Sequence, residues 1–232
     1  METAVLERTR TAAVREKTVL EDESRLHVIY DVTEPIVRGN AVFFAVKRTM
    51  DVILAFVSGL ALALPMLIIA FLIKFDSPGP AIFSQERLGR DGKPFIIYKF
   101  RTMYLDAEAD GPQWAKKHDS RCTPLGRFLR NTRLDELPQI WNILKGDMSI
   151  VGPRPERACF YNEFETYIHG FHYRLLVKPG LTGLAQVNGG YDLKPEEKII
   201  YDIQYIENQS ILMDLKCMFK TVSLIFTHEG AR

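Results

Sequence analysis

The longest run of apolar residues in the chain extends from Val52 to Ile73 and contains 22 residues without a charged side chain. A helix of this length is long enough to cross the hydrocarbon core of a bilayer. Pro65 lies just past the middle of the run, where it removes a helical hydrogen bond and bends the helix. The pattern leaves two structures open: a re-entrant helix that breaks at Pro65, and a plain transmembrane helix that tolerates the proline.

Positively charged residues flank this apolar run on both sides. Lys47 and Arg48 precede it, and Lys74 and Arg87 follow it. Because Lys and Arg are enriched on the cytoplasmic side of membrane helices, this pattern does not select one orientation for a spanning helix. A re-entrant helix would leave both charged ends on the same side.

Apolar residues at helical spacing also follow two adjacent acids, Asp135 and Glu136. These apolar positions are Leu137, Ile140, Trp141 and Leu144, which form one stripe. Pro138 is tolerated only near a helix start, and Gly146 suits the position after a helix end. The positive N-terminal end of a helix keeps nearby carboxylates ionised. We therefore expect an amphipathic helix with Trp141 in the core, whose acids form a metal site, supply a nucleophile or simply cap the helix.

Shorter patterns predict small elements in the rest of the chain. The predicted strands are 81–83 and 94–98 around a turn at 89–92, and the predicted helices are 125–130, 158–167, one opened by Pro195, and 211–225. The last helix has a broad apolar face edged by Lys216 and Lys220, which fits either a soluble core or a membrane interface. Residues 1–40 are charge-rich and lack sustained periodicity, which is typical of a flexible segment, although 26–32 could form a short strand or a helical turn.

The net charge of +1 argues against a general nucleic-acid-binding protein. This balance hides a mildly basic middle, since residues 74–157 contain 15 Lys and Arg against 11 Asp and Glu. Such an excess is compatible with an anionic substrate or an anionic lipid surface. The cysteines Cys122, Cys159 and Cys217 lack metal-ligand spacing, which argues against a structural zinc site.

Several cations stand near the acidic pair in the sequence or on turn-rich backbone, which indicates a site for phosphate groups and a divalent cation. The candidate binding residues are Lys99, Arg101, Arg130, Pro153, Arg154 and Pro155. The two prolines restrict the backbone on both sides of Arg154. A merely solubilising arginine would not need this restriction.

Four collinear segments together resemble the bacterial sugar transferase family, the monotopic phosphoglycosyl transferases. They are FDSPGP (75–80), SQERLGRDGKPFIIYKFRTM (84–103), RNTRLDELPQIWNILKGDMSIVGPRPE (130–156) and KPGLTGLAQVNGG (178–190). The resemblance covers roughly residues 45–230. Several long motifs in the same order are far more specific than any one of them.

The resemblance implies a reaction and a role for each candidate residue. Such enzymes transfer a sugar 1-phosphate from a UDP-sugar to undecaprenyl phosphate or another polyprenyl phosphate, and release UMP. It implies that Asp135 is the nucleophile of a covalent intermediate, with Glu136 as its partner, that Mg²⁺ is required, and that the cations and the 153–155 segment bind phosphates and nucleotide. Asp135 and Glu136 are the candidate Mg²⁺ ligands, because Mg²⁺ is usually bound by one or two carboxylates plus substrate phosphates.

The resemblance also favours the re-entrant helix broken at Pro65, although Leu64 stands where many relatives have serine. We therefore expect an α+β, mainly helical fold with a compact cytosolic catalytic domain, short strands and amphipathic helices at the membrane interface. The expected parts are a flexible extension (1–45), a membrane-embedded re-entrant helix (46–74) and the cytosolic phosphoglycosyl transferase domain (75–232). The expected location is the bacterial inner membrane, with the catalytic domain on the cytoplasmic face.

The expected partners are the UDP-sugar, the polyprenyl phosphate, membrane lipid, downstream glycosyltransferases and a second copy of the chain.

Two other functions are compatible with parts of the sequence. A catalytically idle membrane scaffold for glycan assembly would not need the acidic pair and its cations, and a soluble nucleotide hydrolase conflicts with the apolar run. The sequence does not identify the sugar.

Overall fold

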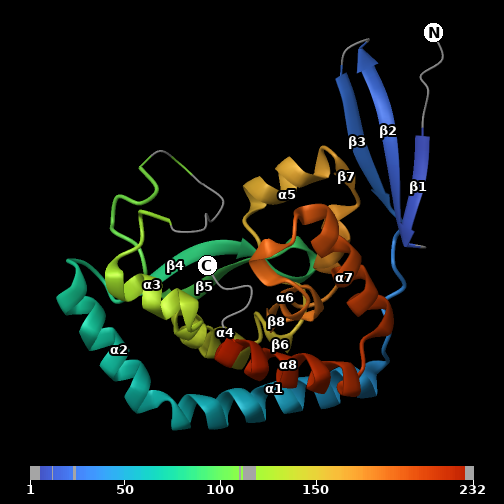
Figure 1. Ribbon diagram of the computed structural model, residues 1–232. Helices are drawn as coiled ribbons and strands as arrows, with labels where there is room; N and C mark the ends of the chain where they lie inside the picture. The colour runs from blue at the N-terminus through green and yellow to red at the C-terminus, as the bar shows by residue number, and fades with distance from the viewer. Residues whose placement is uncertain (1–5, 12, 23–24, 110, 112–118, 228–232) are drawn as a thin grey trace.

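A computed structural model of the chain describes residues 6–11, 13–22, 25–109, 111 and 119–227. Two long helices, α1 (Ala41–Ala61) and α2 (Ala63–Asp76), run along one side of the molecule (Figure 1). The strands and shorter helices lie on the inner side of this pair, and the first three strands project from the opposite end. Helix α8 (Ile211–Thr227) lies alongside α1.

Helices α1 and α2 meet at a bend of 61°. No helix in the described residues is long and apolar enough to cross a bilayer alone, whereas this bent pair meets that test by length and composition. The break is at Leu62, because Pro65 has no N–H group to bond the carbonyl of Ala61. The predicted bend of the apolar run is therefore confirmed, with the break three residues before the proline.

One face of α1 is fixed to the rest of the protein by polar contacts. Lys47 Nζ lies 2.6 Å from Asp214 Oδ2 of α8, and Asp51 Oδ1 accepts a hydrogen bond from the N–H of Ile150 at 3.0 Å. Ala55, one turn further on, is also buried. These positions are four residues apart and so share one helix face. The inner side of α1 is therefore tied to the domain, while its outer side is apolar and exposed.

Three strands lie within the region for which a flexible extension (1–45) is expected from the sequence. Strands β1 (Leu6–Thr11), β2 (Val14–Asp22) and β3 (Arg25–Val32) are antiparallel, and β3 pairs in parallel with the short β7 (Ile168–His169). Side chains two apart on a strand share a face, so β3 buries Tyr30 and Val32 together in the main core. The alternation of buried and exposed side chains in β3 was not recognised because the surrounding sequence is rich in charged residues.

The catalytic domain predicted for residues 75–232 contains two further strand pairs and a series of short helices. A hairpin pairs β4 (Ile82–Leu88) with β5 (Pro94–Phe100) across η1 (Arg90–Gly92), and β6 (Ser149–Val151) pairs in parallel with β8 (Gly180–Thr182). The helices are α3 (Pro124–Asn131), η2 (Leu134–Gln139), α4 (Ile140–Lys145), α5 (Ala158–Glu165), η3 (Phe171–Leu176), α6 (Leu184–Val187), η4 (Gly190–Asp192) and α7 (Pro195–Asn208). The predicted hairpin and the helices predicted near 125–130, 158–167, 195 and 211–225 are confirmed.

The segment that contains the acidic pair differs from its prediction. Asp135 and Glu136 lie on the 3₁₀ helix η2, and the α-helix α4 begins only at Ile140. Because a 3₁₀ helix has three residues per turn, the 3.6-residue spacing does not continue across this junction. Trp141 is consequently 57% exposed, and the prediction that it lies in the core is wrong. Gly146 does end α4, in a left-handed conformation with φ of 96°.

Candidate active site

A cleft of about 500 Å³ lies between the β4–β5 hairpin, residues 101–108, the end of α3, η2 and the segment 154–157. Its lining contains the acidic pair and all four predicted cations. Lys99, Arg130, Arg154 and Pro155 all line it. Lys99 and Pro155, which are 56 positions apart in the sequence, thus line the same cavity.

The acidic pair is held by a sharp change of chain direction. Arg133 follows the end of α3 and has a left-handed backbone with φ of 58°, after which η2 begins. The residue Asn142 then fixes the following α4 to β5: its Oδ1 accepts from the N–H of Tyr98 at 3.1 Å, and its Nδ2 donates to the carbonyl of Ile96 at 2.6 Å. Since Lys99 is on the same strand, these bonds set the register between Lys99 and the acidic pair.

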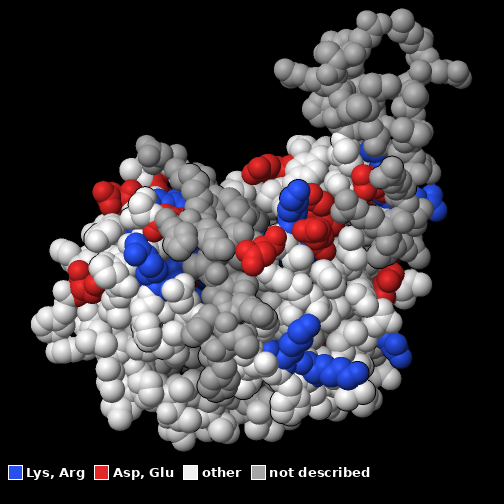
Figure 2. Space-filling view, in the orientation of Figure 1, with Lys and Arg blue, Asp and Glu red and all other residues white. Residues whose placement is uncertain are grey.

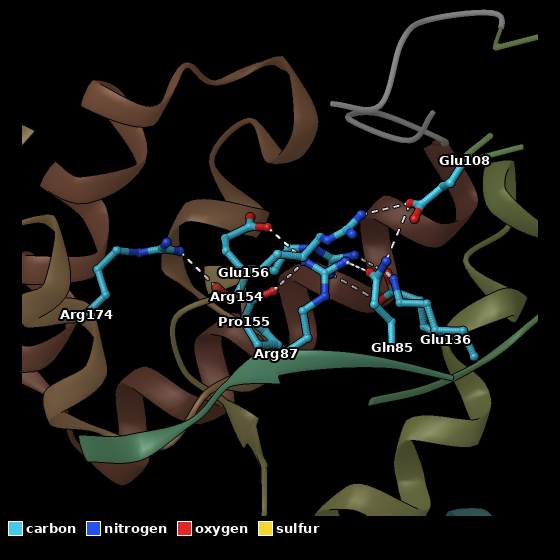
Figure 3. Close-up of polar contacts among 10 residues, drawn as sticks. Gln85, Arg87, Glu108, Glu136, Arg154, Pro155, Glu156 and Arg174 are labelled. Carbon is cyan, nitrogen blue, oxygen red and sulfur yellow. Dashed lines mark hydrogen bonds and ion pairs between the residues drawn. The ribbon is translucent and has the colours of Figure 1, made fainter. Parts of the chain in front are cut away.

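Glu136 is held by two cations. Arg154 Nη2 lies 2.5 Å from Glu136 Oε1, and Arg154 Nη1 lies 3.4 Å from Oε2, so the guanidinium contacts both carboxylate oxygens (Figure 3). Lys99 Nζ lies 3.4 Å from Oε1. Burial raises the pKa of Glu136, but the charges of Arg154 and Lys99 outweigh burial and hold it well below its usual range. Glu136 is therefore an ionised group with a fixed orientation.

Asp135 has a different environment from its neighbour. Its side chain is buried, and in the described part of the chain no side chain donates a hydrogen bond to its carboxylate. Burial and the charge of Glu136 raise the pKa of Asp135 to about 6, while Lys99, Arg130 and Arg154 act in the opposite direction. The carboxylate of Asp135 is therefore mostly ionised at neutral pH and is available for a nucleophilic role.

The remaining predicted binding residues are positioned differently. Arg101 lines the cleft, but its guanidinium donates to the carbonyls of Pro78 and Ser77, both at 2.6 Å, and so fastens the end of α2 to β5. Pro153 is outside the cleft lining, and its carbonyl accepts a hydrogen bond from the N–H of Gly180. Arg130 donates to Cys122 Sγ at 3.3 Å from within the lining. Substrate binding by these residues stays a prediction.

The sequence pattern missed a second polar group that lines the cleft. This group consists of Gln85, Arg87, Glu108, Glu156 and Arg157. Arg87 Nη1 lies 3.1 Å from Glu156 Oε2, and Arg157 Nη1 lies 2.9 Å from Glu108 Oε1 (Figure 3). The available signal was the strand alternation that places Gln85 and Arg87 on one face of β4.

The donor set fits Mg²⁺ as a partner of bound phosphates. No group of three or more His, Cys, Asp or Glu side chains in the described ranges could hold a metal ion, so a site made of protein ligands alone is not present there. Mg²⁺ commonly takes one or two carboxylates and completes its shell with water and substrate phosphates. Asp135 and Glu136 supply such a pair, and it is Glu136 that Lys99 and Arg154 contact.

Residues 42–228 match the family model described as bacterial sugar transferase. The chain belongs to the bacterial sugar transferase family. The match includes the bent helix pair from its second residue onward and every cleft residue named above. The resemblance stated from the sequence motifs is thus confirmed at the level of the family.

Relatives in the bacterial sugar transferase family act on different sugars according to their names. The chain is 43% identical over 196 residues to a UDP-N-acetylgalactosamine-undecaprenyl-phosphate N-acetylgalactosaminephosphotransferase of Aeromonas hydrophila, covering 83% of this chain and 46% of that protein. It is 42% identical over 197 residues to a UDP-glucose:undecaprenyl-phosphate glucose-1-phosphate transferase of Klebsiella pneumoniae (83% and 42%). It is 39% identical over 200 residues to an undecaprenyl-phosphate galactose phosphotransferase of Salmonella typhimurium (80% and 41%). The chain spans less than half the length of each of these relatives.

Proposed function

We propose that this sugar transferase moves a sugar 1-phosphate from a UDP-sugar to undecaprenyl phosphate and releases UMP. The observation that carries the proposal is the cleft in which a buried Asp135 adjoins Glu136 and is surrounded by Lys99, Arg130 and Arg154. Phosphoryl transfer is catalysed mainly by positioning and by neutralising charge on phosphate oxygens. The named relatives support the same class of reaction.

The proposed reaction has two displacements at one phosphorus atom. A carboxylate oxygen of Asp135 attacks the sugar-bearing phosphorus of the donor, and the bond from that phosphorus to the bridging oxygen breaks. UMP leaves with the bridging oxygen and its electron pair. A phosphate oxygen of undecaprenyl phosphate then attacks the same phosphorus, and the aspartyl oxygen leaves as the carboxylate. The products are UMP and an undecaprenyl diphosphate sugar, and Asp135 is regenerated.

The neighbouring side chains have distinct roles in this proposal. Arg154 and Lys99 attract the donor phosphates, and Arg130 adds a third positive charge near the nucleophile. Glu136 keeps Arg154 and Lys99 in place between turnovers. Bound Mg²⁺, which Asp135 and Glu136 would hold, would neutralise further charge on the phosphates.

We further propose that the protein sits on the cytoplasmic face of the bacterial inner membrane, with α1 and α2 as a re-entrant pair. Apolar side chains of α1, α2 and α8 are exposed, among them Phe56, Leu60, Leu67, Phe71 and Phe219. Figure 2 shows few charged side chains among the described residues along the lower edge, where α1 and α2 run in Figure 1. A large exposed apolar surface of this kind supports contact with lipid, and the acceptor is itself a membrane lipid.

The test is UMP release by purified protein in nanodiscs, measured with Mg²⁺ and a panel of UDP-sugars, with and without undecaprenyl phosphate. We expect lipid-dependent turnover with at least one sugar, and near-stoichiometric UMP release without lipid. Asp135→Asn should abolish both. Lipid-independent hydrolysis would contradict the proposal. Glycan assembly that survives Asp135→Asn in cells would instead support a scaffold.

A further inference from the structure

A second arginine, Arg174, is fully buried and contacts the backbone of Arg154. Arg174 belongs to η3, and its Nε lies 2.6 Å from Asp202 Oδ2 of α7. Both side chains are only 1% exposed. The Nη2 of Arg174 donates to the backbone carbonyl of Arg154 at 3.0 Å, as Figure 3 shows. Arg174 therefore connects the interior of the domain to the backbone of a residue that contacts the acidic pair.

The geometry of Arg174 leaves it little freedom. Its guanidinium lies 4.7 Å from the ring centroid of Phe171 and 5.8 Å from that of Tyr161. Burial alone would lower the pKa of Arg174, but the charges of Asp202, Tyr161 and Glu156 and the hydrogen bond to Asp202 together raise it, so the side chain stays charged. The Arg154 carbonyl thus faces a rigid, ionised donor.

The next residues of the same segment are held from the opposite side. Arg87 of β4 donates to the carbonyl of Pro155 at 3.4 Å, and the N–H of Leu88 donates to the carbonyl of Glu156 at 3.1 Å. The backbone of 154–156 is therefore fixed between the η3–α7 side and the β4 side. The Arg154 side chain reaches Glu136 from this backbone. Small movements of the segment 154–156 therefore change the position of the Arg154 guanidinium.

Stability alone does not account for a charged pair at this place. A buried ion pair often contributes no more to folding than apolar residues of similar volume, because both charges lose their hydration. The Nη1 of Arg174 is also buried without a hydrogen-bond partner in the described ranges, which adds a further cost. What the pair does supply is a directed hydrogen bond to one carbonyl, that of Arg154.

We propose that Arg174, oriented by Asp202, is a positioning residue that fixes the backbone from which Arg154 reaches Glu136 and the substrate phosphates. The expected loss of rate rests on the proposed function. The expected effect of Arg174 on the position of Arg154 does not depend on that function. Misplacing a catalytic group by about 1 Å costs on the order of 100-fold in rate. Arg174→Lys keeps a positive charge beside Asp202 but has one donor nitrogen in place of the separate Nε and Nη2 that reach Asp202 and the Arg154 carbonyl.

The kinetic test is a double-mutant cycle on UMP release with Arg174→Lys, Arg154→Met and both together. Arg174→Lys alone should lower kcat/KM by about 10- to 100-fold. In the Arg154→Met background the same change should have almost no further effect, since there is no guanidinium left to position. Equal losses in both backgrounds would show a purely structural role and overturn the inference.

A matched control and a measurement independent of turnover complete the test. Val14→Ala removes buried volume from the same core at a position on β2, so it should lower Tm yet keep most of kcat. In ¹⁵N-arginine spectra, assigned by the loss of a signal in Arg154→Lys, the Arg154 guanidinium should show restricted rotation that Arg174→Lys abolishes. Unchanged Arg154 signals in Arg174→Lys would overturn the inference even in a protein that releases no UMP, whereas absent turnover alone would count only against the proposed function.

Discussion

Two carboxylates adjacent in the sequence have opposite titration behaviour because their surroundings differ. Arg154 contacts both oxygens of Glu136, so its ionised form is strongly favoured. Asp135 is buried beside that negative charge, and its pKa rises to about 6. Such divergence within a pair of acids is typical of sites where the two groups have different tasks. It supports Asp135 as the group that reacts and Glu136 as the group that holds its cationic neighbours.

This divergence predicts a titration in the metal-free protein. Asp135 should be about nine-tenths ionised at pH 7 and about one-tenth ionised at pH 5, because its pKa is about 6. Arg130→Met should raise the pKa further, since the positive charge of Arg130 favours the ionised form. The measurement is a ¹³C-carboxyl NMR titration without divalent cations, assigned with Asp135→Asn. Lys145→Met, outside the cleft lining, is the control; a carboxyl that titrates near 4 would contradict the prediction.

At the residue scale the sequence identified the acids and three of their cationic neighbours, but not the residues that hold them in place. Lys99, Arg130 and Arg154 were found because they are charged and occur in motifs. Asn142 carries no charge, and Arg174 occurs outside the recognised motifs, so neither could be assigned a role by pattern. Only the packing of η2, β5 and η3 reveals which carbonyl or N–H each one meets.

At the scale of elements, the hairpin and most helices could be predicted because their signals are local. Turn residues separate β4 from β5, and Pro195 with Glu197 marks the start of α7, where Glu197 accepts from the N–H of Lys194. The change from 3₁₀ to α-helix at Ile140 could not be predicted, because it depends on the left-handed Arg133 and on contact with β5. Because this junction was not predicted, the prediction that Trp141 lies in the core was also wrong.

The junction between α4 and β5 predicts a large effect of one uncharged substitution. Asn142→Ala removes the partners of the Tyr98 N–H and the Ile96 carbonyl at a partly buried junction, which costs about 1–3 kcal/mol in total. We expect a lower Tm and, where the protein still folds, a lower kcat, because the register of Lys99 against Glu136 is loosened. The measurements are thermal unfolding and UMP release by the same preparation.

Asn208→Ala is the matched control for this substitution. The Asn208 side chain also donates to a backbone carbonyl, that of Gln204 at 3.0 Å, but at an exposed position. Water can replace that bond, so its loss should change Tm very little. Equal effects of the two substitutions would show that Asn142 does not control the junction.

At the scale of the whole molecule, the apolar and polar faces of α1 have separate functions. Lys47 and Asp51 face inward and bind the domain, while Phe56 and Leu60 are exposed. Hydropathy alone predicted an apolar segment starting at Val52, but α1 begins eleven residues earlier, at Ala41. The longer helix could not be predicted, because Lys47 and Asp51 are charged residues whose partners lie about 100 or more positions away in the sequence.

This arrangement predicts which substitutions detach the protein from lipid. Leu60→Lys with Leu67→Lys places two charges on the outer side of the bent pair, at positions 73% and 69% exposed in the structure. Each charge at the centre of an apolar membrane segment costs about 2.5–3.5 kcal/mol, so we expect the partition into vesicles to fall by more than about 100-fold. Because neither side chain is in the core, the fold should be retained. The measurement is flotation with vesicles of phosphatidylethanolamine and phosphatidylglycerol, together with circular dichroism.

Ile36→Lys is the matched control, since Ile36 is 84% exposed but precedes α1 and lies outside the bent pair. It should leave flotation unchanged. If the double variant still floats like the wild type, the outer side of α1 and α2 is not the lipid-binding surface. If Ile36→Lys detaches the protein equally, exposed apolar area in general rather than the bent pair mediates binding. Loss confined to the double variant would link the 61° bend to the membrane, where the undecaprenyl acceptor of the proposed reaction also resides.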